Sequence, residues 1–144
     1  ETIFNLIYKL AVYEKLENDV ITSVEELRTN IFEKKFAEVL IAEEDEKPVG
    51  FALYFHNFST FVGKPGIYLE DLFVEPEMRG KGYGKALLVE LSKIAKERNC
   101  GRLEWSVLDW NTPSIEFYKS LGAKPMDEWT VFRLNKEGIE NLAK

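Results

Sequence analysis

The chain has 144 residues, 45% of them hydrophobic and 31% charged, which fits one folded domain with an ordinary core. Its formal net charge of -6 provides no overall positive field for a phosphate backbone, and this argues against nucleic acid as a partner. The single cysteine, Cys100, cannot form an internal disulfide, and the single histidine, His56, cannot head a histidine-based metal cluster. We therefore expect no metal, and we assign neither residue a catalytic part.

Membrane insertion and export are not expected either. No stretch approaches the roughly 20 apolar residues that a membrane-spanning helix needs. No basic or apolar leader follows Glu1, so nothing resembles a signal peptide. We therefore expect a cytoplasmic protein without membrane contact.

Two helices are predicted at the start of the chain. Apolar residues at three and four spacing predict an amphipathic helix from Thr2 to about Leu16. Ser23 and Glu26 form an S-x-x-E capping box, which predicts the start of a second helix, Val24 to about Phe32. A loop joins the two helices.

Three strands are predicted next. A turn-rich tetrapeptide at residues 45–48 suggests a hairpin between the first two of them. The third is apolar except for two adjacent carboxylates in its middle, Glu70 and Asp71, which an apolar strand does not explain. The three ranges are Glu38–Glu43, Val49–Phe58 and Ile67–Val74.

The rest of the chain alternates helices and strands. Together with the first half it predicts a single α/β domain over residues 1–144, with a mixed, mostly antiparallel twisted sheet and helices on both faces. The expected elements are a helix over Lys85–Asn99, a strand over Arg102–Leu108, a helix over Asn111–Leu121, a strand over Val131–Leu134 that closes the sheet, and a short helix over Lys136–Lys144.

A glycine-rich loop separates the third strand from the helix after it. Alternating glycines let such a loop turn tightly, expose its backbone and aim the free amides of the helix at a ligand. These amides and the helix dipole favour a phosphate, with Arg79, Lys81 and Lys85 adding positive charge. A Walker loop would need Ser or Thr where Ala86 stands, and the glycine spacing does not fit a Rossmann loop. Spacing alone leaves the phosphate ligand open.

Four motifs in order along the chain resemble the GNAT superfamily of N-acetyltransferases, in particular its diamine and thialysine acetyltransferase branch. The resemblance implies acetyl-CoA as cosubstrate, a small-molecule amine as acceptor and a homodimer. It also implies a strand ahead of the first helix, so we expect the native protein to carry further N-terminal residues. The motifs are Tyr68–Val74, Arg79–Gly84 with the R-x-x-G-x-G pattern, Val107–Asn111, and Phe117–Lys119 with Gly122 and Ala123.

Glu70 is the candidate base for this chemistry. An alkylammonium is neutral only to roughly one part in a thousand at pH 7, so a base must help to remove its proton. Glu70 lies in an apolar strand, where burial would make it a better proton acceptor, and it matches the family's glutamate at the substrate amine. The alternative is a paired structural carboxylate. Asp71 ranks lower, because in a regular strand it points away from Glu70 unless a bulge intervenes.

Tyr118 is the candidate acid, because the resemblance implies a general acid near the sulfur and a tyrosine can protonate the departing thiolate. The alternative is a core aromatic side chain.

Asn111 fits a helix N-cap and lies in a stretch where the family contacts CoA; both readings can hold together. The expected cofactor-binding residues are Leu72, Phe73, Val74, whose amides could stabilise the oxyanion, Arg79, Gly80, Lys81, Gly82, Tyr83, Gly84, Lys85, Asn111, Ser114 and Tyr118.

Acidic and aromatic residues are suited to the amine. By resemblance the expected substrate-binding positions include residues after the first helix and on the strand near residue 105. Ser59 and Phe61 depart from the polyamine enzymes, whereas residues 59–60 and Val107–Asn111 look closer to the thialysine members, so a lysine analogue, diamine or polyamine is expected. A CoA-binding sensor without turnover and a protein or peptide acetyltransferase are the alternatives. The expected substrate contacts are Tyr13, Glu14, Glu70, Glu104, Trp105, Ser106 and Glu128.

Overall fold

The computed structural model describes residues 1–144 and divides into two compact units, Glu1–Ser106 and Val107–Lys144, which are described separately. None of its helices is both long and apolar enough to cross a membrane. The helices of the first unit are α1 (Thr2–Tyr13), α2 (Val24–Leu27), which continues as the wider helical segment η2 (Arg28–Glu33), and α3 (Tyr83–Glu97), with short 3-10 turns η1 (Glu17–Asp19) and η3 (Pro76–Met78). Its strands are β1 (Glu38–Glu44), β2 (Lys47–Ser59), β3 (Lys64–Val74) and β4 (Leu103–Trp105), and the second unit holds α4 (Thr112–Ser120) and α5 (Lys136–Leu142).

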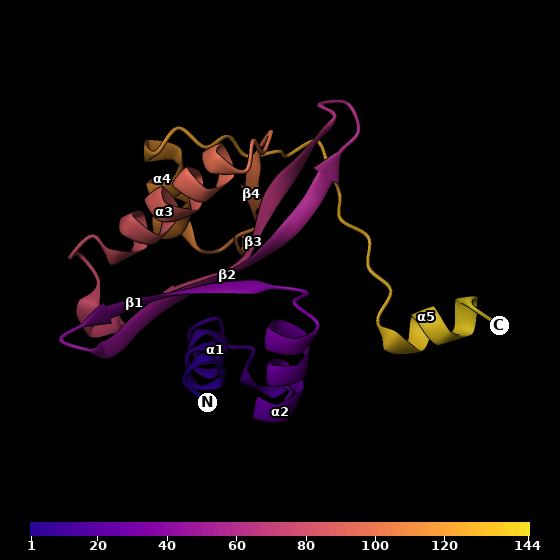
Figure 1. The fold of residues 1–144 in the computed structure, drawn as a ribbon, viewed down its shortest axis with the longest axis horizontal. Helices are drawn as coiled ribbons and strands as arrows, with labels where there is room; N and C mark the ends of the chain where they lie inside the picture. Colours follow the sequence, from indigo (N-terminus) through magenta and orange to yellow (C-terminus); the bar gives the residue numbers. More distant parts are fainter. The chain divides into compact units, whose positions relative to one another are not determined.

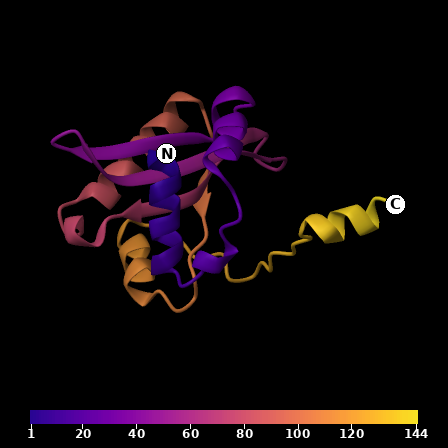
Figure 2. The same cartoon turned by 90° about the horizontal axis from the view of Figure 1, so that it is seen from below.

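The first unit is built on a four-stranded sheet in the order β1-β2-β3-β4 (Figure 1). The pairs β1–β2 and β2–β3 are antiparallel, whereas β3 and β4 are parallel. The helices α1 and α2 lie on one face of the sheet and α3 lies on the other, as Figures 1 and 2 show. The mixed, mostly antiparallel sheet with helices on both faces is therefore confirmed.

The two faces of the sheet bury different side chains. Leu6 and Leu10, one turn apart on α1, are buried with Phe51, Leu53 and Phe73 in one cluster. Strand residues two apart share a face, so Phe51 and Leu53 mark the face of β2 toward α1. On the other face α3 buries three leucines, Leu87, Leu88 and Leu91. The sheet is thus a middle layer with a hydrophobic face on each side.

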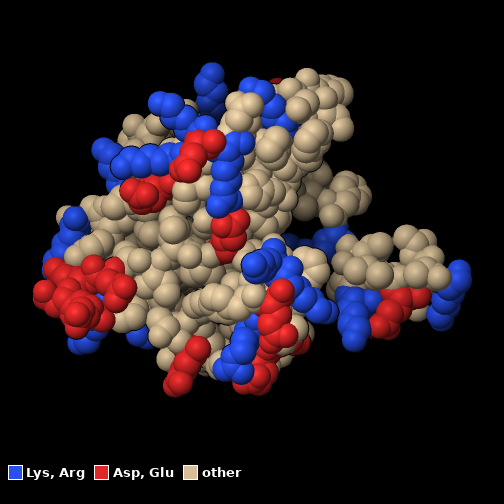
Figure 3. All heavy atoms as spheres, viewed as in Figure 1, with Lys and Arg blue, Asp and Glu red and all other residues tan.

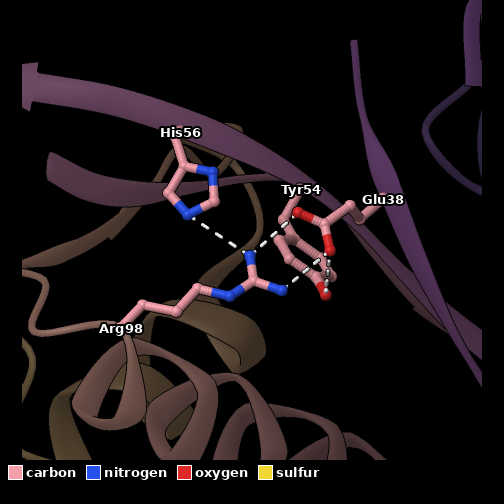
Figure 4. A network of polar contacts seen from close by, with 4 residues as sticks. All are labelled: Glu38, Tyr54, His56 and Arg98. Atoms are coloured by element: carbon pink, nitrogen blue, oxygen red, sulfur yellow. Dashed lines mark hydrogen bonds and ion pairs between the residues drawn. The ribbon is translucent and has the colours of Figure 1, made fainter. Parts of the chain in front are cut away.

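A polar network fastens the end of α3 to the first two strands (Figure 4). Arg98 donates to both carboxylate oxygens of Glu38, at 2.8 and 2.9 Å, and its Nη1 also lies 3.3 Å from Nε2 of His56. The hydroxyl of Tyr54 donates to Glu38 at 3.4 Å. The hydrogen bonds from Arg98 lower the pKa of Glu38, while burial and the Glu38 charge raise the pKa of Tyr54. A two-point arginine–carboxylate contact fixes orientation as well as distance, so it sets where α3 ends against the sheet.

Local signals in the sequence correspond to local structure. Ser23 Oγ accepts the Glu26 N–H at 3.1 Å, as the capping box predicts. Between β1 and β2 the turn residues Asp45 and Glu46 both have left-handed backbones, with φ of 53° and 65°. A two-residue turn of this kind suits the twist of a hairpin. The predicted hairpin is therefore confirmed.

The predicted strand Val131–Leu134 is wrong. Residues 121–135 contain neither helix nor strand, and Val131 and Phe132 are 82% and 92% exposed. Alternating apolar residues favour a strand, but a strand also needs a neighbouring backbone to accept and donate its hydrogen bonds. The predicted strand Arg102–Leu108 is real but shorter, since only Leu103–Trp105 pairs with β3.

Candidate active site

The glycine-rich loop joins the end of β3 to α3 with an open backbone. Gly80 and Gly82 have φ of +83° and +89°, a region that side chains other than glycine rarely adopt. Arg79 N–H donates to Pro76 O at 3.3 Å and Ala86 N–H donates to Gly82 O at 2.9 Å. None of the N–H groups between them, residues 80–85, has a backbone acceptor. The loop and the first turn of α3 therefore present unpaired donors and a positive dipole end to a ligand.

The side chain of Arg79 turns toward β3 and α1. Its Nε donates to the carbonyl oxygen of Val74 at 3.1 Å. The guanidinium carbon lies 4.5 Å from the ring centre of Tyr13 and 5.8 Å from that of Phe73, so the cation is placed over two aromatic faces. Arg79 thus links the start of the loop to the last residue of α1.

The lysines of the loop lie beside an acidic turn. Lys81 Nζ is 3.6 Å from the carboxylate of Glu44, and Lys85 is exposed in the first turn of α3. Glu44 belongs to the acidic run of residues 43–46. Figure 3 shows acidic side chains gathered at the left of the molecule. An anion bound at the loop would compete with Glu44 for the charge of Lys81.

One edge of β3 is left without a neighbouring strand. Pairing between β2 and β3 continues to Gly50 opposite Val74, whereas pairing between β3 and β4 ends at Leu69 opposite Trp105. From Glu70 to Val74 the second edge of β3 therefore faces no strand. This edge includes the stretch Leu72–Val74, whose backbone amides are the expected oxyanion donors, and it runs directly into the glycine-rich loop.

A β-bulge lies where the two adjacent carboxylates stand. Leu53 pairs with Asp71 and the next residue, Tyr54, pairs with Leu69, so Glu70 has no partner on β2. Beyond the extra residue, each side chain of β3 lies on the opposite face of the sheet from the one that regular alternation would give it. In a regular strand Asp71 would share the face of Leu69, but here it shares the face of Leu53, which packs in the α1 cluster. The bulge that the sequence left open is therefore present.

Three carboxylates meet on this face of the sheet. Glu14 caps the C-terminus of α1, and burial together with the charge of Glu70 raises its pKa. Burial, then the charges of Glu70 and Glu14, raise the pKa of Asp71 to about 7. The expected burial of Glu70 is wrong, because Glu70 is exposed and Asp71 is the partly buried carboxylate. A pair of adjacent acids inside an apolar strand was the signal in the sequence, but only the register decides which one is buried.

The expected substrate residues on and after β4 are held by hydrogen bonds to neighbouring strands. Glu104 accepts from the side-chain amide of Asn57 at 3.2 Å and lies 3.2 Å from the guanidinium of Arg102. Ser106 Oγ lies 2.8 Å from the Tyr68 hydroxyl. Trp105 pairs with Leu69, directly before the bulge. Trp105 is therefore the last paired residue before the open edge, and Glu104 is already engaged by two polar groups.

The hairpin between β2 and β3 carries Ser59 and Phe61, the two positions at which a departure from the polyamine enzymes is expected. Ser59 is buried and its Oγ accepts the Val62 N–H at 3.2 Å, so it stabilises the turn. Phe61 is fully exposed at the tip. Ser59 therefore has a structural explanation in the hairpin.

The second unit holds the remaining expected site residues. Asn111 is buried, and its Oδ1 accepts the Ser114 N–H at 3.3 Å, so it caps α4 as the sequence predicts. Tyr118 lies on α4, partly buried, with its ring centre 5.7 Å from that of Phe117. Glu128 is exposed in the segment between α4 and α5. Within this unit the cap fixes the start of the helix that carries Tyr118.

The chain is similar to known proteins over most of its length. Residues 4–123 match the acetyltransferase (GNAT) family. Thialysine N-epsilon-acetyltransferase of Bos taurus is 40% identical over 153 residues, covering 98% of this chain and 89% of the bovine protein. The Caenorhabditis elegans protein of the same name is 33% identical over 146 residues, covering 99% and 90%. An integron cassette protein from the V. cholerae mobile metagenome superposes with a TM-score of 0.80 at 34% identity, covering 95% of this chain and 86% of that one.

The matched region spans nearly all of the first unit and the first part of the second, and it includes β3, the glycine-rich loop and α4. The resemblance drawn from the four sequence motifs is therefore confirmed. The chain belongs to the acetyltransferase (GNAT) family and is an acetyltransferase.

Proposed function

We propose that the protein transfers an acetyl group from acetyl-CoA to a small primary amine through a ternary complex. The observation that carries this proposal is the last part of β3, where an unpaired strand edge runs from a carboxylate cluster directly into an anion-binding loop. One strand thereby offers an amine site and a cosubstrate site. The names of the bovine and C. elegans relatives support a lysine analogue such as thialysine, with a diamine or polyamine as further members of the same class.

In this proposal the backbone binds acetyl-CoA. The unpaired N–H groups of residues 80–85 hold the diphosphate at the positive end of α3. The open edge of β3 binds the pantetheine arm, and amides in Leu72–Val74 stabilise the oxyanion. The proposed cofactor contacts are Leu72, Phe73, Val74, Arg79, Gly80, Lys81, Gly82, Tyr83, Gly84 and Lys85, with Asn111, Ser114 and Tyr118 of the second unit.

Replacing Gly82 tests the loop. Gly82→Ala should weaken acetyl-CoA binding about tenfold, because a left-handed alanine costs roughly 1–2 kcal/mol and the loop relaxes away from the geometry that exposes its amides. Calorimetric titration with acetyl-CoA measures the change. Gly63→Ala is the matched control, since Gly63 also has a positive φ, of +73°, and open space around it, but lies in the β2–β3 hairpin. Equal affinity of the Gly82 variant and the wild type would remove the loop from the site.

Acid–base chemistry completes the proposal. Glu70 contacts the substrate ammonium and promotes its deprotonation, so that the neutral amine attacks the thioester carbonyl. Tyr118 then protonates the departing thiolate, whose ordinary pKa of about 8.5 lies below the value of about 10 for a tyrosine. Both assignments rest on the match of residue types to the chemistry and on the family resemblance.

The amine would lie among acidic and aromatic side chains, where Glu14 and Glu70 supply negative charge to hold an alkylammonium. We further propose a homodimer, as the resemblance implies, and a cytoplasmic location. The proposed substrate contacts are Tyr13, Glu14, Glu70, Glu104, Trp105 and Ser106, with Glu128 of the second unit.

A thiol-release screen tests the function. Purified protein and acetyl-CoA are incubated with thialysine, lysine, diamines, polyamines and a lysine-containing peptide, and free CoA thiol is measured. We expect amine-dependent release with a small primary amine, and initial rates that vary with both substrates as a ternary complex requires. Binding of acetyl-CoA without turnover of any amine would instead identify a CoA-binding sensor. Turnover of the peptide alone would identify a peptide acetyltransferase.

A further inference from the structure

The bulge in β3 separates the two adjacent acids into different environments. Glu70, the unpaired residue, is exposed, while Asp71 is partly buried opposite Leu53. We propose that Asp71 accepts the proton that the substrate ammonium loses, and that Glu70 and Glu14 hold the ammonium beside it. This inference rests on the proposed amine acetylation and assigns the base within that site.

The positions of the three carboxylates support these separate roles. Glu14 reaches the site from the C-terminus of α1, and Glu70 and Asp71 reach it from the bulge, so the carboxylates come from two elements. The partner of Asp71 on β2 is the apolar side chain of Leu53, which offers no hydrogen bond to stabilise a carboxylate. Asp71 is thus a carboxylate in a largely apolar setting next to two others. An incoming cation is the favourable partner that this setting lacks.

The electrostatic surroundings of Asp71 give its carboxylate a proton affinity that suits a general base. Burial and the charges of Glu70 and Glu14 raise the pKa of Asp71 to about 7. A general base works best when its pKa lies near the operating pH, because it is then both unprotonated and a useful proton acceptor. Other charged groups at this end of the sheet include Arg79, over the rings of Tyr13 and Phe73, and two ion pairs, Lys9 with Glu75 and Lys81 with Glu44.

The proton balance of the reaction follows. The ammonium gives one proton to the Asp71 carboxylate and becomes a neutral amine, whose nitrogen forms a bond to the acetyl carbonyl carbon. The C–S bond breaks and the thiolate takes a proton from Tyr118. The nitrogen loses its second proton as the amide forms, which restores the tyrosine hydroxyl through solvent, and Asp71 releases its proton to bulk water. The products are the N-acetyl amine, CoA thiol and one proton.

The test is the pH dependence of kcat/KM for the amine. The wild-type profile should have an acidic limb: below about pH 7, kcat/KM should fall about tenfold for each pH unit. Asp71→Asn should lower kcat/KM by about 10²–10⁴-fold above the limb and abolish the limb itself. Glu70→Gln should keep the limb but move it to lower pH, because the Glu70 charge raises the pKa of Asp71. Glu14→Gln should move it in the same direction by a smaller amount, because its charge has the smaller effect.

Controls separate this inference from the function on which it rests. Glu90→Gln removes one charge from an exposed position on α3 and should leave the limb unchanged. Two amines with different pKa values should give the limb at the same pH, which excludes ionisation of the substrate as its cause. A limb that persists in Asp71→Asn and disappears in Glu70→Gln would overturn the inference while acetylation stands. A wild type that acetylates no amine would instead overturn the proposed function.

Discussion

Tyr118→Phe is expected to reduce kcat by about 10²–10⁴-fold, the usual contribution of a positioned acid or base. The reason is that the substitution deletes the hydroxyl that protonates the departing thiolate and keeps the ring that lies beside Phe117 on α4. The affinity for acetyl-CoA should change little, because the loop that holds the diphosphate is untouched. Steady-state kinetics together with calorimetric titration of acetyl-CoA measures both quantities.

Tyr8→Phe provides the matched control for this experiment. Tyr8 is 45% exposed on α1 and has no part in the proposed chemistry, so the same loss of a hydroxyl should leave kcat unchanged. If Tyr118→Phe turns over as fast as wild type, Tyr118 leaves the mechanism. A reduced kcat with an unchanged melting temperature supports it, since a merely structural tyrosine would reveal itself in stability.

Asp71→Asn is expected to stabilise the fold at pH 8 by up to about 4 kcal/mol. The raised pKa means that folded Asp71 still holds a proton at pH values where the unfolded chain has lost it, between 3.8 and about 7. The wild type therefore loses stability as the pH rises through this window, at up to 1.36 kcal/mol for each unit of pKa difference. Asparagine cannot ionise, so the variant does not lose this stability as the pH rises.

Urea unfolding at pH 4 and pH 8 checks this result. The free energies of wild type and Asp71→Asn should differ more at pH 8 than at pH 4, and the comparison cancels other groups that titrate in the same range. Glu90→Gln, which removes a charge from the exposed face of α3, should show no such divergence from wild type. Curves for wild type and Asp71→Asn that stay parallel over the whole range would show that Asp71 is not held in a raised-pKa state.

Asp71→Asn should have opposite effects on stability and on turnover. Removing its charge should increase stability and, under the inference above, decrease turnover. Functional sites commonly hold a carboxylate in surroundings that destabilise its charge, at a cost in stability. The same burial raises the proton affinity of the carboxylate, which is what the function uses. A variant that gains stability without losing activity would separate the strained carboxylate from catalysis.

Much of the fold could be read from local chemistry. The Ser23 cap, the Asp45–Glu46 turn and the Asn111 cap each depend on contacts within three or four residues, and all three are present. The strand at Val131–Leu134 failed because its formation requires a partner backbone far along the chain. The Arg98–Glu38 contact was also invisible, since it joins residues 60 positions apart.

The sequence by itself determined the glycine-rich loop, its donors and the family, because these depend on residue types at short spacing. Only the tertiary structure decided which carboxylate is buried. One unpaired residue in β3 reverses the face of Asp71, and that register is set by pairing with β2 and packing against α1. Alternation along a single strand does not contain this information, because burial and neighbouring charge belong to the assembled sheet and helix.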